Sequence, residues 1–93
     1  MAPPGEYSLR VLCTAQRCLD RLPEVVAAAV VEFMLGPLTK NPQRVGKRLR
    51  RQIAHLHSAR RGPYRVIYRI DEEERVVEVQ RIDHRNDAYR MRG

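Results

Sequence analysis

The chain has 93 residues, which is enough for one compact domain with a modest core and too few for two. Its hydrophobic fraction of 43% suits a folded protein, and its net charge of +7 favours a polyanionic partner. The longest apolar stretch, residues 25–35, is interrupted by Glu32 and is too short to span a membrane. We therefore expect a single cytoplasmic domain over residues 1–93, with no membrane partner and with residues 1–6 as a flexible N-terminus.

The first half of the chain predicts one strand and two helices. Residues 7–13 alternate between apolar and polar side chains, as a half-buried strand does. Thr14 is the expected N-cap of a first helix, which stops at Pro23. Pro23 in turn suits the first turn of a second helix, with Glu24 beside its positive end. Because this second helix is apolar over most of its circumference, it must be largely covered, and a partner chain could supply part of that cover.

The second half predicts three strands. After Gly36-Pro37 and Asn41-Pro42 end the helical region, residues 53–57 form a short strand and residues 64–71 a strong one. An acidic hairpin turn leads to a returning strand over residues 75–82, with Val77 and Val79 directed inward. The order strand, helix, helix, strand, strand, strand predicts an α+β fold. In it, two N-terminal helices pack on a mostly antiparallel four-stranded sheet.

The positive charge is concentrated in the second half. Residues 1–43 carry four cations and four acids, so the whole net charge belongs to residues 44–93. Residues 44–61 contain no Asp or Glu at all. A solvated basic face is the ordinary interpretation of such a run, but the lack of interleaved acids favours a surface that binds a polyanion such as a nucleic acid. The candidate RNA-binding residues are Lys47, Arg48, Arg50, Arg51, Arg60 and Arg61.

The two cysteines point to no special chemistry. We expect Cys13, at the end of the first strand, and Cys18, on an apolar helix face, to be reduced and buried. A zinc site would need further ligands nearby, and the three histidines all lie 37 or more positions beyond Cys18. The sequence also lacks a glycine-rich phosphate loop and a serine nucleophile elbow. We therefore predict neither a metal site nor a cofactor.

Two places concentrate groups that could act on a phosphodiester. Arg65 lies within the strongest strand, where packing does not require a cation and a rigid guanidinium could hold a phosphate through two hydrogen bonds. A cross-strand ion pair with an acid such as Glu78 is the structural alternative. Residues 82–90 add His84, Arg85 and Tyr89. They supply an imidazole of a type that titrates near neutral pH, a cation, and an aromatic ring that can stack on a base. A basic tail that tethers a partner is the alternative there.

Three stretches of the chain together resemble the RelE/ParE toxin superfamily, and most closely its actinobacterial RelE-type members. They are residues 38–42 after the second helix, residues 56–68 with the sequence Gly-Pro-Tyr-Arg-Val-Ile-Tyr, and residues 82–90 with His-Arg-Asn-Asp-Ala-Tyr-Arg. The similarity extends over nearly the whole chain, from about residue 7 to residue 91. The Tyr-Arg-Val-Ile-Tyr segment is its most specific part.

The resemblance implies a microbial-RNase-like fold and a ribosome-dependent endoribonuclease, an mRNA interferase that stops translation. It assigns Arg65 to the scissile phosphate, Arg85 to a second functional arginine and Tyr89 to RNA stacking or activation. His84 is the other candidate general base. It also implies a type II toxin–antitoxin system, with mRNA, the ribosome and a cognate antitoxin as partners in a hetero-oligomer. The chain departs from the family pattern in its few lysines and in Asp83, which leaves the general base open between Tyr89 and His84.

Two other functions remain open from the sequence. One is a ParE-like toxin that poisons gyrase by binding, against which the Tyr89-Arg90 ending argues. The other is a nucleic-acid-binding module without catalysis. Cleavage of mRNA on the ribosome, with attack by the RNA's own 2′-hydroxyl and without a metal ion, is the prediction that combines the basic run with both motifs.

Overall fold

The computed structural model describes residues 7–49 and 55–84 of the chain, and within them the strands form one sheet. The strands are β1 (Ser8–Val11), β2 (Lys47–Arg48), β3 (Leu56–Arg61), β4 (Tyr64–Asp71) and β5 (Val76–His84). Their order across the sheet is β1-β5-β4-β3-β2, with β1 parallel to β5 and the other neighbours antiparallel. The predicted α+β class and mostly antiparallel sheet are confirmed. The predicted strand count is wrong, because the sheet has five strands and not four. The N-terminus predicted over residues 1–6 lies outside the described residues.

The strands β2 and β3 account for the difference. The short edge strand β2 pairs with β3 through only two residues, which is too few to leave an alternating pattern in the sequence. The strand predicted over residues 53–57 is instead Leu56–Arg61, so Arg60 and Arg61 belong to the sheet and not to a loop. The cause is a tight turn in which Gly62 adopts a φ of 59° and Arg61 pairs directly with Tyr64. Glycine reaches this conformation without strain, so the ladder can continue to the very end of β3.

The helix α1 (Cys13–Arg21) starts earlier than predicted. Leu12 occupies the N-cap position in an extended conformation, and its backbone N–H still donates to Val79 in β5. Thr14 therefore lies inside the first turn, and the prediction that it caps the helix is wrong. For the same reason Cys13 is an exposed helical residue and not a buried strand residue, whereas Cys18 is half-buried as an amphipathic face requires.

The helix α2 (Glu24–Phe33) follows Pro23, which stands at its N-cap and not within its first turn. Gly36-Pro37 does not end the helical region as predicted, because a π-helical segment, η1 (Met34–Leu38), carries the chain through it. The wider turn accommodates a proline that has no backbone N–H to donate. Thr39 then donates its hydroxyl to the carbonyls of Leu35 and Gly36 at 3.2 Å each. A short helix that was not predicted, α3 (Pro42–Val45), leads into β2.

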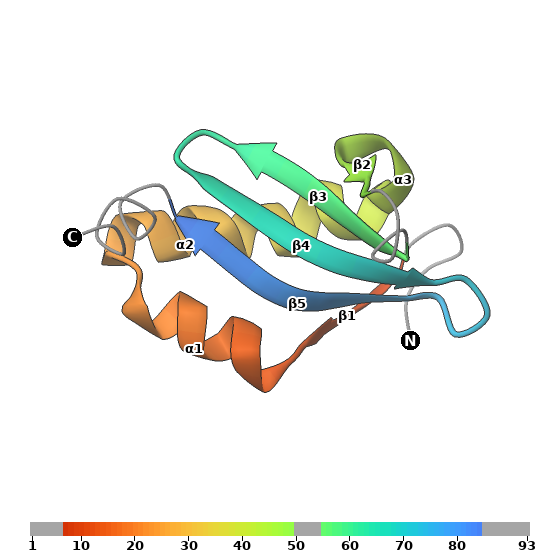
Figure 1. Cartoon of the computed structure of the whole chain (residues 1–93), viewed down its shortest axis with the longest axis horizontal. Helices are drawn as coiled ribbons and strands as arrows, with labels where there is room; N and C mark the ends of the chain where they lie inside the picture. Colours follow the sequence, from red (N-terminus) through yellow and green to blue (C-terminus); the bar gives the residue numbers. More distant parts are fainter. Residues whose placement is uncertain (1–6, 50–54, 85–93) are drawn as a thin grey trace.

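Among the described residues, helices cover one face of the sheet and leave the other face open. Figure 1 shows α2 crossing behind β3, β4 and β5, while α1 runs beside β5 beyond the end of β1. The core fills the space behind the sheet, where Val30 and Phe33 of α2 meet strand side chains that include Val66, Tyr68 and Val77. No described helix is both apolar enough and long enough to cross a bilayer.

A bulge in β5 decides which of its residues enter the core. Tyr68 pairs with Val79 and Ile67 pairs with Arg81, so Gln80 is an extra residue on this strand. Val77 and Val79 are fully buried, as predicted from the sequence. Beyond the bulge the inward positions shift by one, and Ile82 and His84 become the buried residues. The bulge therefore places His84 on the helix-covered face and leaves Asp83 facing outward beside Arg65.

Candidate functional site

The open face of the sheet carries a groove at its β2 edge, which we call the basic groove. It has a volume of about 640 Å³ and lies between α3, β2, β3 and β4. Of the residues that the structure describes, five cations and no acid line this groove. The described lining is Arg44, Val45, Gly46, Lys47, Arg48, Leu49, Ser58, Arg60 and Arg65. A concave surface that is lined by positive charges alone focuses the electrostatic field and attracts an anion into it.

Strand register brings two arginines side by side in this groove. Arg60 of β3 pairs directly with Arg65 of β4, and both side chains are exposed. Like charges directly opposite one another destabilise a sheet, so this pairing opposes folding unless an anion binds between them. Both arginines stand on strands and not on a loop, which limits the positions that their guanidinium groups can take. The arrangement suits a phosphate that accepts hydrogen bonds from more than one guanidinium.

The acids that could neutralise Arg65 are bound to other arginines. Asp83, its cross-strand partner in β5, accepts two hydrogen bonds from Arg81, at 2.9 and 3.0 Å. Glu78, the alternative partner expected from the sequence, accepts instead from Arg69 at 3.2 Å and from Arg10 at 3.5 Å. Among the described residues, no ion pair joins an acid to Arg65. Its guanidinium is therefore available to a ligand.

The rim of the groove is fixed to the core through Tyr68. This residue is fully buried, and its hydroxyl donates a hydrogen bond to the carbonyl of Pro42 at the start of α3. Burial raises the pKa of Tyr68 to about 12, so the hydroxyl remains a donor throughout the physiological range. The chain packs tightly here, because a Cβ added to Gly46 would lie 2.5 Å from the Tyr68 hydroxyl and 2.8 Å from the Ser58 carbonyl. Close packing between Tyr68, α3 and β2 thus holds the basic segment against the sheet.

The structure gathers some of the predicted site residues and separates others. Lys47, Arg48, Arg60 and Arg65 all line the basic groove. Arg61 lies on the opposite face, with its guanidinium 4.8 Å from the centre of the Phe33 ring, because its pairing with Tyr64 turns it toward α2. The remaining predicted residues, Arg50, Arg51, Arg85 and Tyr89, lie outside the described residues.

His84 is not brought together with Arg65. Its side chain is buried, and it pairs with the buried Tyr64 on the helix-covered face. Burial is also the chief cause that raises the pKa of Tyr64 above its ordinary value of 10.0. His84 and Arg65 therefore lie on opposite faces of the same two paired strands.

Two polar residues that line the groove were not among the predicted site residues. Arg44 belongs to the same acid-free run as the predicted cations, so its charge signal was present in the sequence. Ser58 lies in the groove because it pairs with Lys47 across β2 and β3, and only knowledge of the edge strand could have placed it there.

The ion pairs of Glu78 with Arg69 and Arg10 allow a prediction of how the stability of the fold depends on pH. The pKa of Glu78 is lowered from its ordinary 4.5, first by the hydrogen bond from Arg69 and also by that from Arg10. A lowered pKa in the folded protein means that the carboxylate stabilises the fold above pH 4.5, and that this contribution disappears as the pH falls through the lowered value. Urea unfolding of Glu78→Gln should therefore show a stability deficit at pH 7 that vanishes in acid. Glu73→Gln, on the exposed hairpin turn, serves as the control and should show no such convergence.

Within residues 7–49 and 55–84, no cluster of three or more His, Cys, Asp and Glu side chains could hold a metal ion.

Comparison with known families and sequences gives consistent matches. A family described as the ParE toxin of the type II toxin–antitoxin system parDE matches residues 9–89. The toxin RelG of Mycobacterium tuberculosis is 54% identical over 84 residues, which are 90% of this chain and 97% of RelG. The toxin RelE of the same organism is 50% identical over 91 residues, which are 98% of this chain and 94% of that toxin.

Solved structures of RelE-type toxins are also similar to this chain. A chain of the toxin–antitoxin complex RelBE2 from M. tuberculosis superposes with a TM-score of 0.85 at 52% identity, covering 86% of this chain and 99% of that one. The isolated RelE toxin of E. coli superposes with a TM-score of 0.68 at 18% identity, covering 94% of this chain and 99% of that one. This more distant likeness supports the fold alone.

Proposed function

Because the chain belongs to the ParE/RelE family of type II toxin–antitoxin toxins, as a RelE-type member, we propose that it is an endoribonuclease that cleaves messenger RNA on the ribosome. The proposal rests mainly on the exposure of Arg65 and on its lack of a neutralising acid among the described residues. This arginine stands exposed in a basic groove, beside Arg60, while both nearby acids are bound by other arginines. Two neighbouring cations without counter-charge suit a phosphodiester that gains negative charge as it is cleaved.

The proposed reaction uses the RNA as its own nucleophile. The 2′-oxygen attacks the adjacent phosphorus, its proton passes to a general base, and the bond from phosphorus to the 5′-oxygen breaks as that oxygen takes up a proton. The products are a 2′,3′-cyclic phosphate and a 5′-hydroxyl end. Negative charge accumulates on the phosphoryl oxygens in the transition state, where guanidinium groups stabilise it. Arg65 and Arg85 take this role in the proposal, and they supply it without a metal ion.

Tyr89 is the proposed general base. A tyrosine has an ordinary pKa near 10 and needs cationic neighbours to act near neutrality, and this part of the chain offers several. The buried position of His84 on the helix-covered face supports Tyr89 over His84 for the proton transfer. Lys47, Arg48 and Arg60, together with Arg50 and Arg51, are proposed to hold the RNA and the ribosome by phosphate contacts.

We further propose that a cognate antitoxin neutralises the protein in a hetero-oligomer in the cytoplasm. An acidic amphipathic segment would complement both the basic groove and the apolar surface of the helical layer, where Val25 is 82% exposed and Leu35 is 64% exposed. The similar RelBE2 chain from M. tuberculosis was solved in a toxin–antitoxin complex, which supports an assembly of this kind.

The proposal is tested by brief induction of the full chain followed by mapping of mRNA ends. New 5′-hydroxyl ends within translated reading frames, together with loss of protein synthesis, are the expected result. A DNA-damage response with continued protein synthesis would instead indicate a gyrase poison. Intact mRNA despite binding to RNA would indicate a binding module without catalysis.

The protein should retain its activity after treatment with a metal chelator. Toxin dialysed against EDTA and then added to programmed ribosomes in magnesium buffer should cleave mRNA at the rate of untreated toxin, because the charge stabilisation comes from arginine side chains. The rate is measured by primer extension on a single message. Loss of cleavage that returns only when a transition metal is added to the dialysed toxin would contradict the metal-independent reaction.

A further inference from the structure

Arg81 and Asp83 lie on the open face of β5, beside the part of β4 that carries Arg65. The bulge at Gln80 places them there, because beyond it the odd-numbered residues of β5 face outward. Asp83 pairs across the strands with Arg65, and Arg81 pairs with Ile67. Direct cross-strand neighbours have Cβ atoms about 4.5–5.5 Å apart. Asp83 therefore lies within reach of two cations, one on its own strand and one on β4.

Of these two cations, Asp83 binds Arg81. The Nε of Arg81 donates to one carboxylate oxygen at 2.9 Å, and an Nη donates to the other at 3.0 Å. This fork engages both oxygens at once, which makes the pair more specific in geometry than a single contact. Both side chains remain accessible, since 59% of Arg81 and 34% of Asp83 are exposed. Among the described residues, Asp83 forms an ion pair with Arg81 alone.

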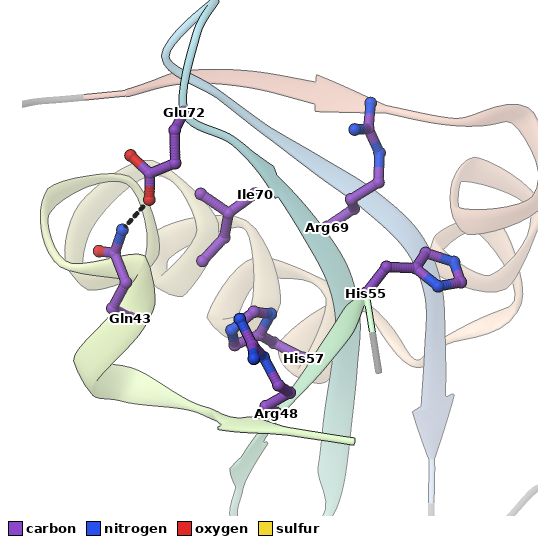
Figure 2. A pocket seen from close by; sticks show the side chains of 7 residues that line it. All are labelled: Gln43, Arg48, His55, His57, Arg69, Ile70 and Glu72. Carbon is purple, nitrogen blue, oxygen red and sulfur yellow. Dashed lines mark hydrogen bonds between the residues drawn. The ribbon is translucent and has the colours of Figure 1, made fainter. Parts of the chain in front are cut away.

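Glu78, which faces outward before the bulge, shows what an acid on this strand does otherwise. It pairs across the strands with Arg69 and accepts a hydrogen bond from it at 3.2 Å. Figure 2 shows the side chain of Arg69 directed away from the adjacent Ile70, as successive side chains of a strand are. The cross-strand neighbour of Glu78 is thus also its counter-ion.

The contrast between the two acids explains why one arginine of β4 is free. Arg69 is bound by the acid opposite it, whereas Arg65 is not, because Arg81 occupies both oxygens of Asp83. Without Arg81, the cation directly opposite Asp83 is Arg65, and the two would form the same cross-strand ion pair. That pair would compete with an RNA phosphate for the guanidinium of Arg65.

We propose that Arg81 is a positioning residue for RNA cleavage, which holds Asp83 so that the guanidinium of Arg65 stays free for the scissile phosphate. Arg81 acts through Asp83 and does not contact the reacting atoms. This inference rests on the proposed function, and it adds a residue that keeps the site open to its substrate. The bulge at Gln80 becomes part of the site, because a regular β5 would turn Arg81 toward the helix-covered face.

The test compares single-turnover cleavage of mRNA on programmed ribosomes. Arg81→Ala should cleave about fivefold more slowly than the wild type, the factor that a strong cross-strand ion pair represents. Arg81→Lys keeps the charge but loses the fork, so its rate should lie between the two. Adding Asp83→Asn to Arg81→Ala should restore the wild-type rate, because an amide does not neutralise Arg65. Asp83→Asn alone should cleave no more slowly than the wild type.

Two controls separate this role from a change in net charge. Arg17→Ala removes an exposed cation from α1 and should cleave at the wild-type rate. Glu73→Gln, on the exposed hairpin turn, restores the net charge of Arg81→Ala without changing Asp83, so this double variant should stay slow.

Nitrogen-15 NMR of the Arg65 side chain gives a readout that needs no RNA. In Arg81→Ala the Nε resonance of Arg65 should move from its wild-type position as Asp83 pairs with it. Adding Asp83→Asn should return the resonance toward that position. A merely structural role of Arg81 at the surface of β5 would not produce this reversal.

Each other outcome overturns the inference. If the wild type cleaves mRNA and Arg81→Ala cleaves as fast, the inference fails and the proposed function stands. A loss that Asp83→Asn does not restore would show that Arg81 contacts the RNA itself, and equal recovery with Glu73→Gln would show that only net charge matters. If the wild type leaves mRNA intact, the proposed function fails, and the role of Arg81 in cleavage fails with it.

Discussion

Replacing Arg65 by alanine is expected to lower the rate of mRNA cleavage on the ribosome by about 10²–10³-fold, the usual effect of removing one donor that stabilises transition-state charge. Arg65→Lys keeps the charge but loses the paired donors of the guanidinium, and its rate should fall between those of Arg65→Ala and the wild type. The rate is measured by primer extension under single-turnover conditions. Growth arrest after induction gives an independent readout, and it should disappear with Arg65→Ala.

Two control variants separate this role from a general charge effect. Arg21→Ala removes an exposed cation from the last turn of α1, far along the chain from the groove, and should cleave at the wild-type rate. Lys47→Ala removes a groove cation that positions RNA, and its smaller loss relative to the wild type should shrink as the salt concentration rises, because the variant releases fewer counterions when it binds. If Arg65→Ala cleaves as fast as Arg21→Ala, then Arg65 has no part in the chemistry.

Replacing Tyr68 by alanine is expected to lower the free energy of unfolding by about 3–5 kcal/mol, because it leaves a cavity where a fully buried ring stood. Small domains have only about 5–15 kcal/mol in total, so this variant is expected to be marginally stable. Tyr68→Phe keeps the ring and leaves the Pro42 carbonyl without its donor, which should cost about 1–3 kcal/mol. Urea unfolding followed by circular dichroism measures both losses.

The control for Tyr68 is the 82% exposed Val25 on α2. Val25→Ala should change the unfolding free energy by no more than about 0.5 kcal/mol. Equal stability of Tyr68→Phe and the wild type would show that the hydrogen bond to Pro42 adds nothing, and that packing alone holds α3 and β2 against the sheet.

The parts of the fold that were predictable are those with a strong local pattern. The strand β4 was predicted with its observed bounds, because Tyr64, Val66 and Tyr68 alternate with outward side chains and an acidic turn follows. The inward positions Val77 and Val79 of β5 follow from the same kind of alternation. Each of these patterns is read from neighbours in the chain, so no knowledge of the tertiary structure was needed.

The features that were missed depend on pairing partners distant in sequence. The bulge at Gln80 changes the inward face of β5 in mid-strand, so the burial of His84 could not follow from a uniform alternation. Likewise β2 exists only because two residues meet β3 across the sheet. Of the candidate site, the charge run indicated which cations gather, but only the register shows that Arg60 adjoins Arg65 while Arg61 faces the other way.

The pairing of β1 with β5 has a consequence for how the protein is made. These strands join residues almost seventy positions apart, as in the contact between Arg10 and Glu78, so the sheet is completed by one of the longest loop closures that the chain allows. During synthesis, β1 leaves the ribosome long before β5 exists to receive it. The core residues Val77 and Val79 arrive equally late. A nascent chain that stops short of β5 therefore cannot complete the sheet or the core behind it.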